Sequence, residues 1–229
     1  MVAGCAGVGM VIASFLPETR PGRQAGDGTA APAPLSLRMR FLHPAAVGPG
    51  VVLFCVGVGW TALSAFLALY TRQIGMGSSG PLFLTLSITV LCTRALAGSL
   101  ADRWGKATVL YPSVVAVVAG MALLAAWQRP GAAYVGVVLF GGGFSGLFPV
   151  LFAAVVDRAP DAERGAAMGS FNVFFDLGSP IGGYGVGQLI DWGGFGLGFG
   201  TMAALAAVGG LIMPGMLRGN AAAVTPRST

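Results

Sequence analysis

The chain has 229 residues, of which 55% are hydrophobic and only 9% are charged. Soluble domains carry roughly 25% charged residues, so a soluble protein of this composition would lack polar surface. Its 13 Lys and Arg against 8 Asp and Glu would suggest nucleic acid binding in a soluble chain. Here the basic residues lie in short segments between apolar runs, which indicates orientation in a membrane. We therefore expect a lipid bilayer as partner and no nucleic acid.

The first two segments differ from the rest of the chain. Residues 1–16 are apolar, but a helix of that length reaches only about 24 Å, less than the roughly 30 Å of a bilayer core. We interpret them as a partial transmembrane segment, the end of a sixth span whose beginning is missing. Residues 17–46 are rich in Pro, Gly and Ala, which predicts a flexible cytoplasmic linker.

Six apolar runs then form a half-domain over residues 47–217. They lie near 48–70, 81–101, 107–127, 132–156, 165–190 and 195–217. Each is long enough to cross the bilayer as a helix, and the short connections predict that neighbours in sequence pack antiparallel. The sequence therefore predicts an all-α, polytopic bundle of membrane helices, followed by a cytoplasmic tail at 218–229.

The charges between the spans predict the orientation of the bundle. On one side the connections hold ten basic residues, namely Arg20, Arg23, Arg38, Arg40, Arg103, Lys106, Arg158, Arg164, Arg218 and Arg227. The opposite side holds only Arg72 and Arg129, with Trp127 and Trp192 at span ends, where aromatic rings prefer the headgroup layer. Because basic residues gather on the cytoplasmic side, we expect a multi-pass inner-membrane protein with a cytoplasmic C-terminus.

A short pattern recurs three spans apart. Gly98, Leu100 and Asp102 close the second span, and Gly187, Leu189 and Asp191 close the fifth at the same offsets. Because three is an odd number, the two copies lie on opposite membrane faces. This arrangement indicates two inverted three-helix repeats, which are typical of secondary transporters.

The turn after the second span resembles the signature loop of the major facilitator superfamily. That loop has a Gly, an Asp four residues later, a basic residue, a Gly and two further basic residues. The chain matches it at Gly98, Asp102, Arg103, Gly105 and Lys106 and departs from it at residue 107, an alanine.

The resemblance implies the C-terminal six-helix half of a twelve-span major facilitator fold, in a truncated or split chain. It further implies a permease that moves a small solute, by import or by efflux, through alternating access coupled to protons. The partner would be an N-terminal half or a second copy in a homodimer. The alternative from another class is a non-transporting half that acts as a structural partner.

Two ionisable residues fall inside spans. Arg94 lies about 12 Å and Asp176 about 16 Å from the cytoplasmic ends of their spans, and both are costly to leave unpaired in hydrocarbon. We expect them to form an ion pair across the second and fifth spans. That pair would be either a proton-sensitive latch or a permanent contact that only fixes helix register.

Other polar residues fall at helical spacing on three spans. Asn172, Asp176 and Ser179 mark one face of the fifth span, and Trp60 with Ser64 marks the first. For Trp60, Asn172 and Asp176 we favour a solute path near the midplane. For Thr85, Thr89 and Thr93 on the second span we favour interhelical packing and hydrogen bonding.

The Asp102 turn could anchor the third span through an Asp102 cap, while Arg103 and Lys106 stay at the lipid headgroups. The alternative is a tight turn whose charges only set the topology.

An enzyme is a weaker interpretation. Residues 143–146, with Ser145 between glycines, resemble the nucleophile motif of rhomboid intramembrane proteases. A serine nucleophile needs a base, and the sole histidine, His43, precedes the first full span. We expect no catalytic residue, no metal and no cofactor, and no Walker-type ATP loop occurs in the sequence.

Overall fold

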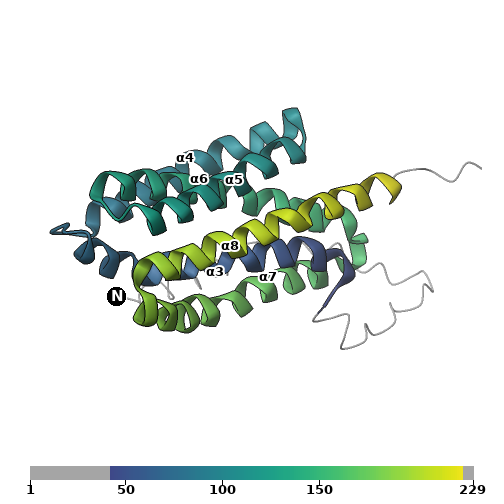
Figure 1. Cartoon of the computed structure of the whole chain (residues 1–229). Helices are drawn as coiled ribbons and strands as arrows, with labels where there is room; N and C mark the ends of the chain where they lie inside the picture. The colour runs from purple at the N-terminus through teal and green to yellow at the C-terminus, as the bar shows by residue number, and fades with distance from the viewer. Residues whose placement is uncertain (1–41, 224–229) are drawn as a thin grey trace, which may run out of the picture. The chain divides into compact units, whose positions relative to one another are not determined.

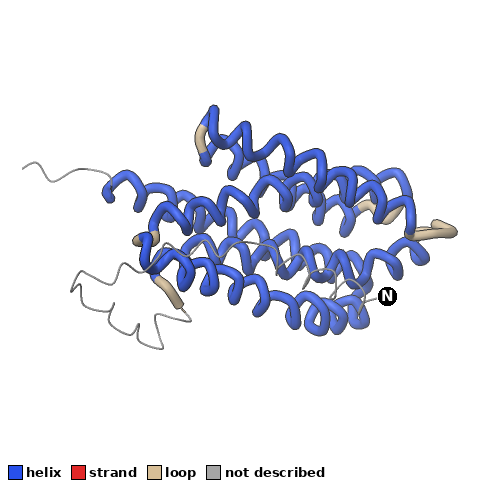
Figure 2. The backbone as a smooth tube through the Cα atoms, turned by 180° about the vertical axis from the view of Figure 1, so that it is seen from behind, coloured by secondary structure: helices blue, strands red, loops and turns tan. Residues whose placement is uncertain are grey.

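The structure, a computed structural model, describes residues 42–223, with side chains for all of these except 97–104 and 215–223. The described part is helical, and no strand occurs in it. The predicted segment 1–16, most of the linker and the end of the tail lie outside the described residues. Short loops connect the helices, as the tube in Figure 2 shows.

The first three predicted spans correspond to three helices. α3 covers Pro44–Gln73, α4 covers Gly80–Trp104 and α5 covers Lys106–Ala126. α3 begins at a proline, whose fixed φ suits the first turn of a helix. Between α4 and α5 the chain turns at Gly105, whose φ of +88° is open to glycine at no steric cost.

The second three spans are α6, α7 and α8. α6 covers Pro130–Arg158, and after a short 3₁₀ turn, η1 (Asp161–Glu163), α7 covers Arg164–Pro180. A π-helical turn, η2 (Ile181–Gly185), joins α7 to α8 (Val186–Ala223). The change of helix type follows directly after Pro180, whereas α6 continues as an α-helix through Pro149.

A break inside α8 separates the fifth predicted span from the sixth. Gly193 has φ −137°, and Gly194 has φ +71° with an extended ψ, so the helix stops and restarts there. Among the described residues, four helical runs suit a bilayer by length and composition, and the last, Asp161–Pro214, contains this break. A shorter apolar helix covers Gly80–Leu96. The six predicted spans therefore correspond to six helical segments of the described chain.

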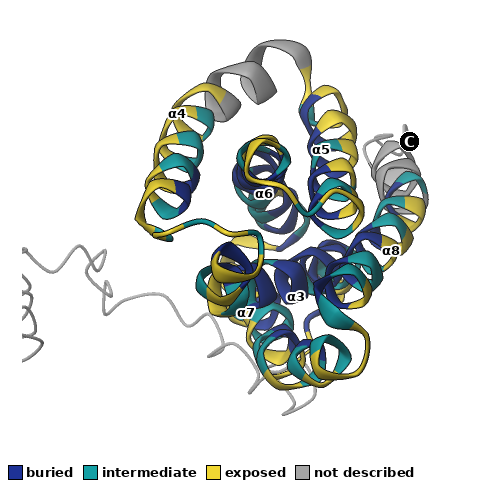
Figure 3. Cartoon of the chain, turned by 60° about the vertical axis from the view of Figure 1, so that its left-hand side comes forward, coloured by how far each residue is buried: buried dark blue, intermediate teal, exposed yellow. Residues whose placement is uncertain are grey.

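The packing confirms the two three-helix units. α4 packs against α6 as α7 packs against α3, and α5 packs against α6 as α8 packs against α3. If α3, α4 and α5 are exchanged for α6, α7 and α8, the same helix contacts result, as a pseudo-two-fold relation between the two units requires. The first helix of each unit packs among the helices of the other unit. α6 lies between α4 and α5, and α3 lies beside α7 and α8 (Figures 1 and 3).

The core lies where α3 and α6 meet. Leu53, Leu63 and Leu67 of α3 and Phe140 and Leu147 of α6 are fully buried. Small residues bring the other helices close: a methyl group at Gly143 of α6 would lie 2.4 Å from the Ser113 carbonyl oxygen of α5. Such close backbone contact is typical of helices packed in membranes.

Candidate functional site

α6 carries four phenylalanines along one side. Phe140, Phe144, Phe148 and Phe152 recur every fourth residue, so their rings lie above one another on the helix surface. Consecutive ring centroids are 6.2, 6.3 and 6.5 Å apart. We call these four residues the aromatic row. Phe140 and Phe144 are buried, and Phe148 and Phe152 are partly exposed.

Aromatic side chains of α3 and α7 join the row. Trp60 of α3 stacks on Phe144, with centroids 4.6 Å apart and ring planes 16° from parallel. Phe171 of α7 contacts Phe148 at 5.8 Å, and Phe175 contacts Phe144 at 6.3 Å. Each such pair is worth about 0.5–1.5 kcal/mol beyond the area it buries. The predicted site residue Trp60 is therefore held by α6, in a contact that the sequence analysis missed.

Arg94 of α4 approaches the same row. Its guanidinium carbon lies 6.0 Å from the Phe148 ring centroid, and the residue is exposed in this bundle. An arginine at that distance over a ring is attracted by the negative ring face. The row thus connects a cation on α4 with the ring of Trp60 on α3.

The predicted ion pair between Arg94 and Asp176 is wrong. Among the described residues, no acid lies within 4.0 Å of the Arg94 guanidinium, and no base lies that close to the Asp176 carboxylate. The physical reason is the pseudo-two-fold arrangement, in which α4 packs on α6 and α7 packs on α3. The depths expected from the sequence are similar, but α4 and α7 pack on different members of the α3–α6 pair.

Asp176 and Asn172 lie one turn apart on α7, and both are exposed. Each directly follows a phenylalanine that contacts the row, Phe171 or Phe175. Their predicted companion Ser179 instead faces α3, with its hydroxyl 3.4 Å from that of Thr61. α7 therefore exposes a carboxylate and an amide at the positions that follow its two aromatic contacts in sequence.

The remaining polar positions are used in packing or in local bonds. Ser64 donates to the Trp60 carbonyl oxygen at 2.8 Å, and Thr85 donates to that of Pro81 at 2.9 Å. A methyl group at Gly142 of α6 would lie 3.5 Å from the Thr93 hydroxyl and 3.6 Å from the Thr89 methyl. These contacts support the packing interpretation of the threonines.

The turn between α4 and α5 carries the signature loop. Lys106, the first residue of α5, forms an ion pair with Asp157 in the last turn of α6. Lys106 therefore has an acidic partner on the neighbouring helix, and its position at the lipid headgroups stays a prediction. Gly98, Asp102 and Arg103 belong to the stretch 97–104, whose side chains are not described, and the residue before α5 is Gly105, which provides no side-chain cap.

Comparison with known families decides the identity. The model of the Major Facilitator Superfamily matches residues 1–183 and residues 86–228 of this chain. The chain belongs to this superfamily. The Salmonella typhimurium MFS-type transporter STM4428 is 33% identical over 170 residues, which are 74% of this chain and 44% of the relative. The Escherichia coli MFS-type transporter YhhS is 27% identical over 198 residues, 86% of this chain and 47% of the relative.

The facilitator fold is also found among solved structures. The crystal structure of the POT family transporter PepTSo matches with a TM-score of 0.67 at 18% identity, over 73% of this chain and 36% of that one. An auto-inhibited POT family peptide transporter matches equally well, over 76% of this chain and 37% of its own. This chain is a multi-pass membrane protein that spans about half the length of the curated relatives it matches.

His43 has a structural role in this facilitator chain that the sequence did not predict. Its Nδ1 accepts a hydrogen bond from the Ala45 amide at 3.2 Å and so caps α3. Its Nε2 lies 2.9 Å from Glu163 Oε2, and its amide donates to Ser170 Oγ at 3.0 Å. The start of α3 is thereby tied to η1 and α7. The sequence feature that could have indicated this cap is a residue with a side-chain acceptor directly before Pro44, since proline is common at the first position of a helix.

Ser145 of this facilitator chain is used in packing. Its hydroxyl is buried and donates to the Val90 carbonyl oxygen of α4 at 2.9 Å. His43, which would have to serve as the base, is held at the start of α3 by Glu163. Within the described residues no group of three His, Cys, Asp or Glu side chains could hold a metal ion.

Proposed function

We propose that this chain is the C-terminal half of a secondary active transporter that moves a small solute by alternating access, coupled to protons. Membership of the Major Facilitator Superfamily supports transport, and the two related three-helix units support an alternating mechanism. The other half would be an N-terminal half or a second copy of this chain. The charge bias of the connections supports an inner-membrane protein with its C-terminus in the cytoplasm.

One observation carries the proposal: ionisable side chains inside membrane spans are exposed in this half. Arg94 and Asp176 lie well within α4 and α7 and are not covered by the described residues. Charged groups at such depth are costly in lipid and normally face a bundle interior or an aqueous path. We therefore assign the faces that carry Arg94, Asp176 and Asn172 to the solute path between two halves.

The aromatic row forms the apolar part of that path. Trp60, Phe148 and Phe175 are partly exposed, and the Arg94 guanidinium lies over the Phe148 ring, so a solute there would meet ring faces and edges. Arg94 would orient an anionic or hydrogen-bond-accepting group of the solute. Asn172 would offer both a donor and an acceptor.

Asp176 is our candidate for the coupling proton. A carboxylate held by a permanent ion pair would stay charged through the cycle, whereas Asp176 has no basic partner among the described residues. Moving such a group from water to an apolar surrounding favours its protonated form. Alternate exposure of Asp176 to the two sides would then couple solute movement to proton movement.

Membrane vesicles test the proposal. Vesicles containing the chain, alone or with the N-terminal half of the Salmonella relative supplied as a second chain, are energised to a stable pH gradient. A panel of small ring-bearing solutes is then added, and a pH-sensitive dye reports proton movement. We expect at least one solute to dissipate the gradient, and Asp176→Asn to abolish this response while solute–solute exchange continues.

Asp161→Asn is the matched control. Asp161 is an exposed carboxylate of η1 that pairs with Arg164 on the surface, so its loss should leave the response unchanged. Equal proton movement by wild type and Asp176→Asn would contradict the role of Asp176. If no solute moves protons in either preparation, the non-transporting structural half becomes the better interpretation.

A further inference from the structure

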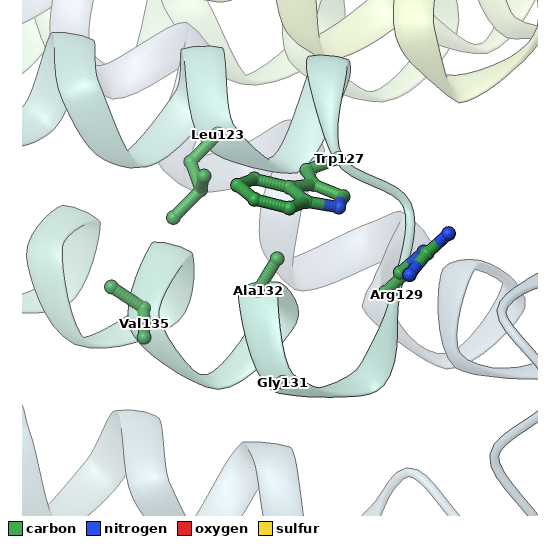
Figure 4. A pocket seen from close by; sticks show the side chains of 6 residues that line it. All are labelled: Leu123, Trp127, Arg129, Gly131, Ala132 and Val135. Carbon is green, nitrogen blue, oxygen red and sulfur yellow. The ribbon is translucent and has the colours of Figure 1, made fainter.

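A pocket opens between the end of α5 and the start of α6, away from the aromatic row. Its volume is about 460 Å³, within the roughly 300–1,000 Å³ of small-molecule sites. Six residues line it: Leu123, Trp127, Arg129, Gly131, Ala132 and Val135. Figure 4 shows Leu123 and Trp127 of α5 opposite Ala132 and Val135 of α6, with Arg129 in the connection between the helices.

The pocket lies on the side of α6 that would meet lipid. The buried Phe140 and Phe144 face Trp60 of α3, whereas Val135 and Val138 are 52% and 42% exposed. In a membrane protein, apolar side chains exposed in this way are surrounded by acyl chains. An apolar pocket open to that surface is filled by hydrocarbon more favourably than by water, which would find few polar partners there.

The mouth of the pocket has the chemistry of the headgroup layer. Trp127 follows the last residue of α5 and is 59% exposed, in the position where an amphipathic ring prefers the interface. Arg129 directly precedes α6, and no acid lies within 4.0 Å of its guanidinium among the described residues. The first turn of α6 adds the positive end of its helix dipole to the same place.

Two other pockets lack this combination of an apolar wall and an arginine. A pocket of about 390 Å³ between α5 and α8 is lined by apolar side chains and Tyr111, with no charged residue. A smaller pocket of about 240 Å³ contains Arg72 with Thr71, Ser78 and Ser79, so it has polar walls. The first could hold an acyl chain without selecting its headgroup, and the second offers little apolar wall. The pocket at Arg129 has both an apolar wall and a cation.

We propose that this pocket binds one phospholipid of the surrounding leaflet, with its phosphate on Arg129 and an acyl chain between Leu123 and Val135. Arginine suits this role because its planar guanidinium can donate two parallel hydrogen bonds to phosphate oxygens. Trp127 would cover the glycerol region between phosphate and chain. The bound lipid would join α5 to α6 at the end of the bundle where residues 127–129 connect the two helices.

Lipid titration of the purified chain in detergent, followed by native mass spectrometry, tests the proposal. The probes are phosphatidylglycerol, diacylglycerol and glycerol 3-phosphate, which separate the complete lipid from its chain and its phosphate. We expect saturable binding of one phosphatidylglycerol, with at least fivefold weaker binding of each of the other two. Equal binding of diacylglycerol, or of glycerol 3-phosphate, would overturn the proposal.

Three variants locate the site. Arg129→Gln should weaken phosphatidylglycerol binding at least fivefold, and Arg129→Lys should keep it within about threefold of wild type, because the positive charge remains. Ala132→Phe should weaken binding at least fivefold by filling the apolar part while leaving Arg129 in place. The helix content of each variant is checked by circular dichroism, and Arg129→Gln carries the test if Ala132→Phe does not fold.

Arg72→Gln is the matched control. Arg72 is an exposed arginine at the same end of the bundle. Its neighbour Gln73 donates a hydrogen bond at 3.0 Å to Gln128, the residue before Arg129. Its loss should leave phosphatidylglycerol binding within twofold of wild type. Equal weakening by Arg72→Gln and Arg129→Gln would mean a general surface-charge effect and would overturn the site.

Discussion

Arg94 of α4 lies over the ring of Phe148 of α6, with its guanidinium carbon 6.0 Å from the ring centroid. This contact takes the place of the ion pair with Asp176 that matching depths suggested. It leaves two opposite charges inside one half of a facilitator bundle, on helices that pack on different members of the α3–α6 pair. An arginine that rests on a ring keeps its positive charge available to a ligand, whereas one neutralised by a carboxylate does not.

The contact predicts measurable coupling between Arg94 and Phe148. We expect a double-mutant cycle of Arg94→Gln and Phe148→Leu to give a coupling free energy of unfolding of about 0.5–1 kcal/mol, as for other partly exposed cation–π pairs. Unfolding of the detergent-solubilised chain, followed by circular dichroism, measures it. Phe152→Leu is the matched control, one turn further along the row, and its coupling to Arg94 should be close to zero. Equal coupling at both positions would contradict the contact.

A second cycle tests the correction to the predicted ion pair. Arg94→Gln and Asp176→Asn remove charges from helices that do not pack on each other, so their effects on the free energy of unfolding should add within about 0.5 kcal/mol. The same unfolding measurement applies. A coupling above about 1 kcal/mol would show that the two residues interact in the isolated chain after all.

The sequence predicted the helices of this chain far better than their neighbours in space. Span positions follow from local hydropathy, and the turns at Gly105 and Gly194 follow from residues that tolerate a positive φ. The pairing of Arg94 with Asp176 needed knowledge of which helix lies between their two spans. Depth in the membrane can be counted along one helix, but the direction in which a side chain points depends on the packing of the whole bundle.

The candidate site was predictable in part. Trp60, Asn172 and Asp176 were selected because polar or amphipathic residues in apolar spans are conspicuous. The aromatic row was visible as phenylalanines four residues apart, but the same spacing occurs in any packed helix core. Only the contacts of Trp60 and Arg94 with the row distinguish it, and these come from α3 and α4, which are distant in sequence.

Two adjacent glycines of α6 predict different responses to the same substitution. A methyl group at Gly143 would lie 2.4 Å from the Ser113 carbonyl oxygen, whereas at Gly142 the nearest atom would lie at 3.5 Å. Gly143→Ala must therefore push α5 away from α6, and overpacking of this kind typically costs about 1–3 kcal/mol. We expect the melting temperature in detergent to fall for Gly143→Ala and to stay near wild type for Gly142→Ala. A larger fall for Gly142→Ala would be inconsistent with the packing of α5 on α6.

His43 should stabilise the chain mainly as a helix cap. His43→Ala removes the acceptor of the Ala45 amide and also the contact with Glu163, so we expect a loss of about 1–2 kcal/mol in the free energy of unfolding. His43→Asn keeps an oxygen acceptor that can cap α3 but is too short to reach Glu163. It should therefore recover most of that loss.

Glu163→Gln separates the two contributions of His43. The cap remains in this variant, and an amide oxygen can still accept a hydrogen bond from Nε2, so the loss should stay below about 1 kcal/mol for this partly exposed pair. Hydrogen exchange at the first turn of α3 provides a local measurement, with faster exchange expected in His43→Ala than in Glu163→Gln. If Glu163→Gln opened that turn as much as His43→Ala, the His43–Glu163 contact and not the cap would hold the start of α3.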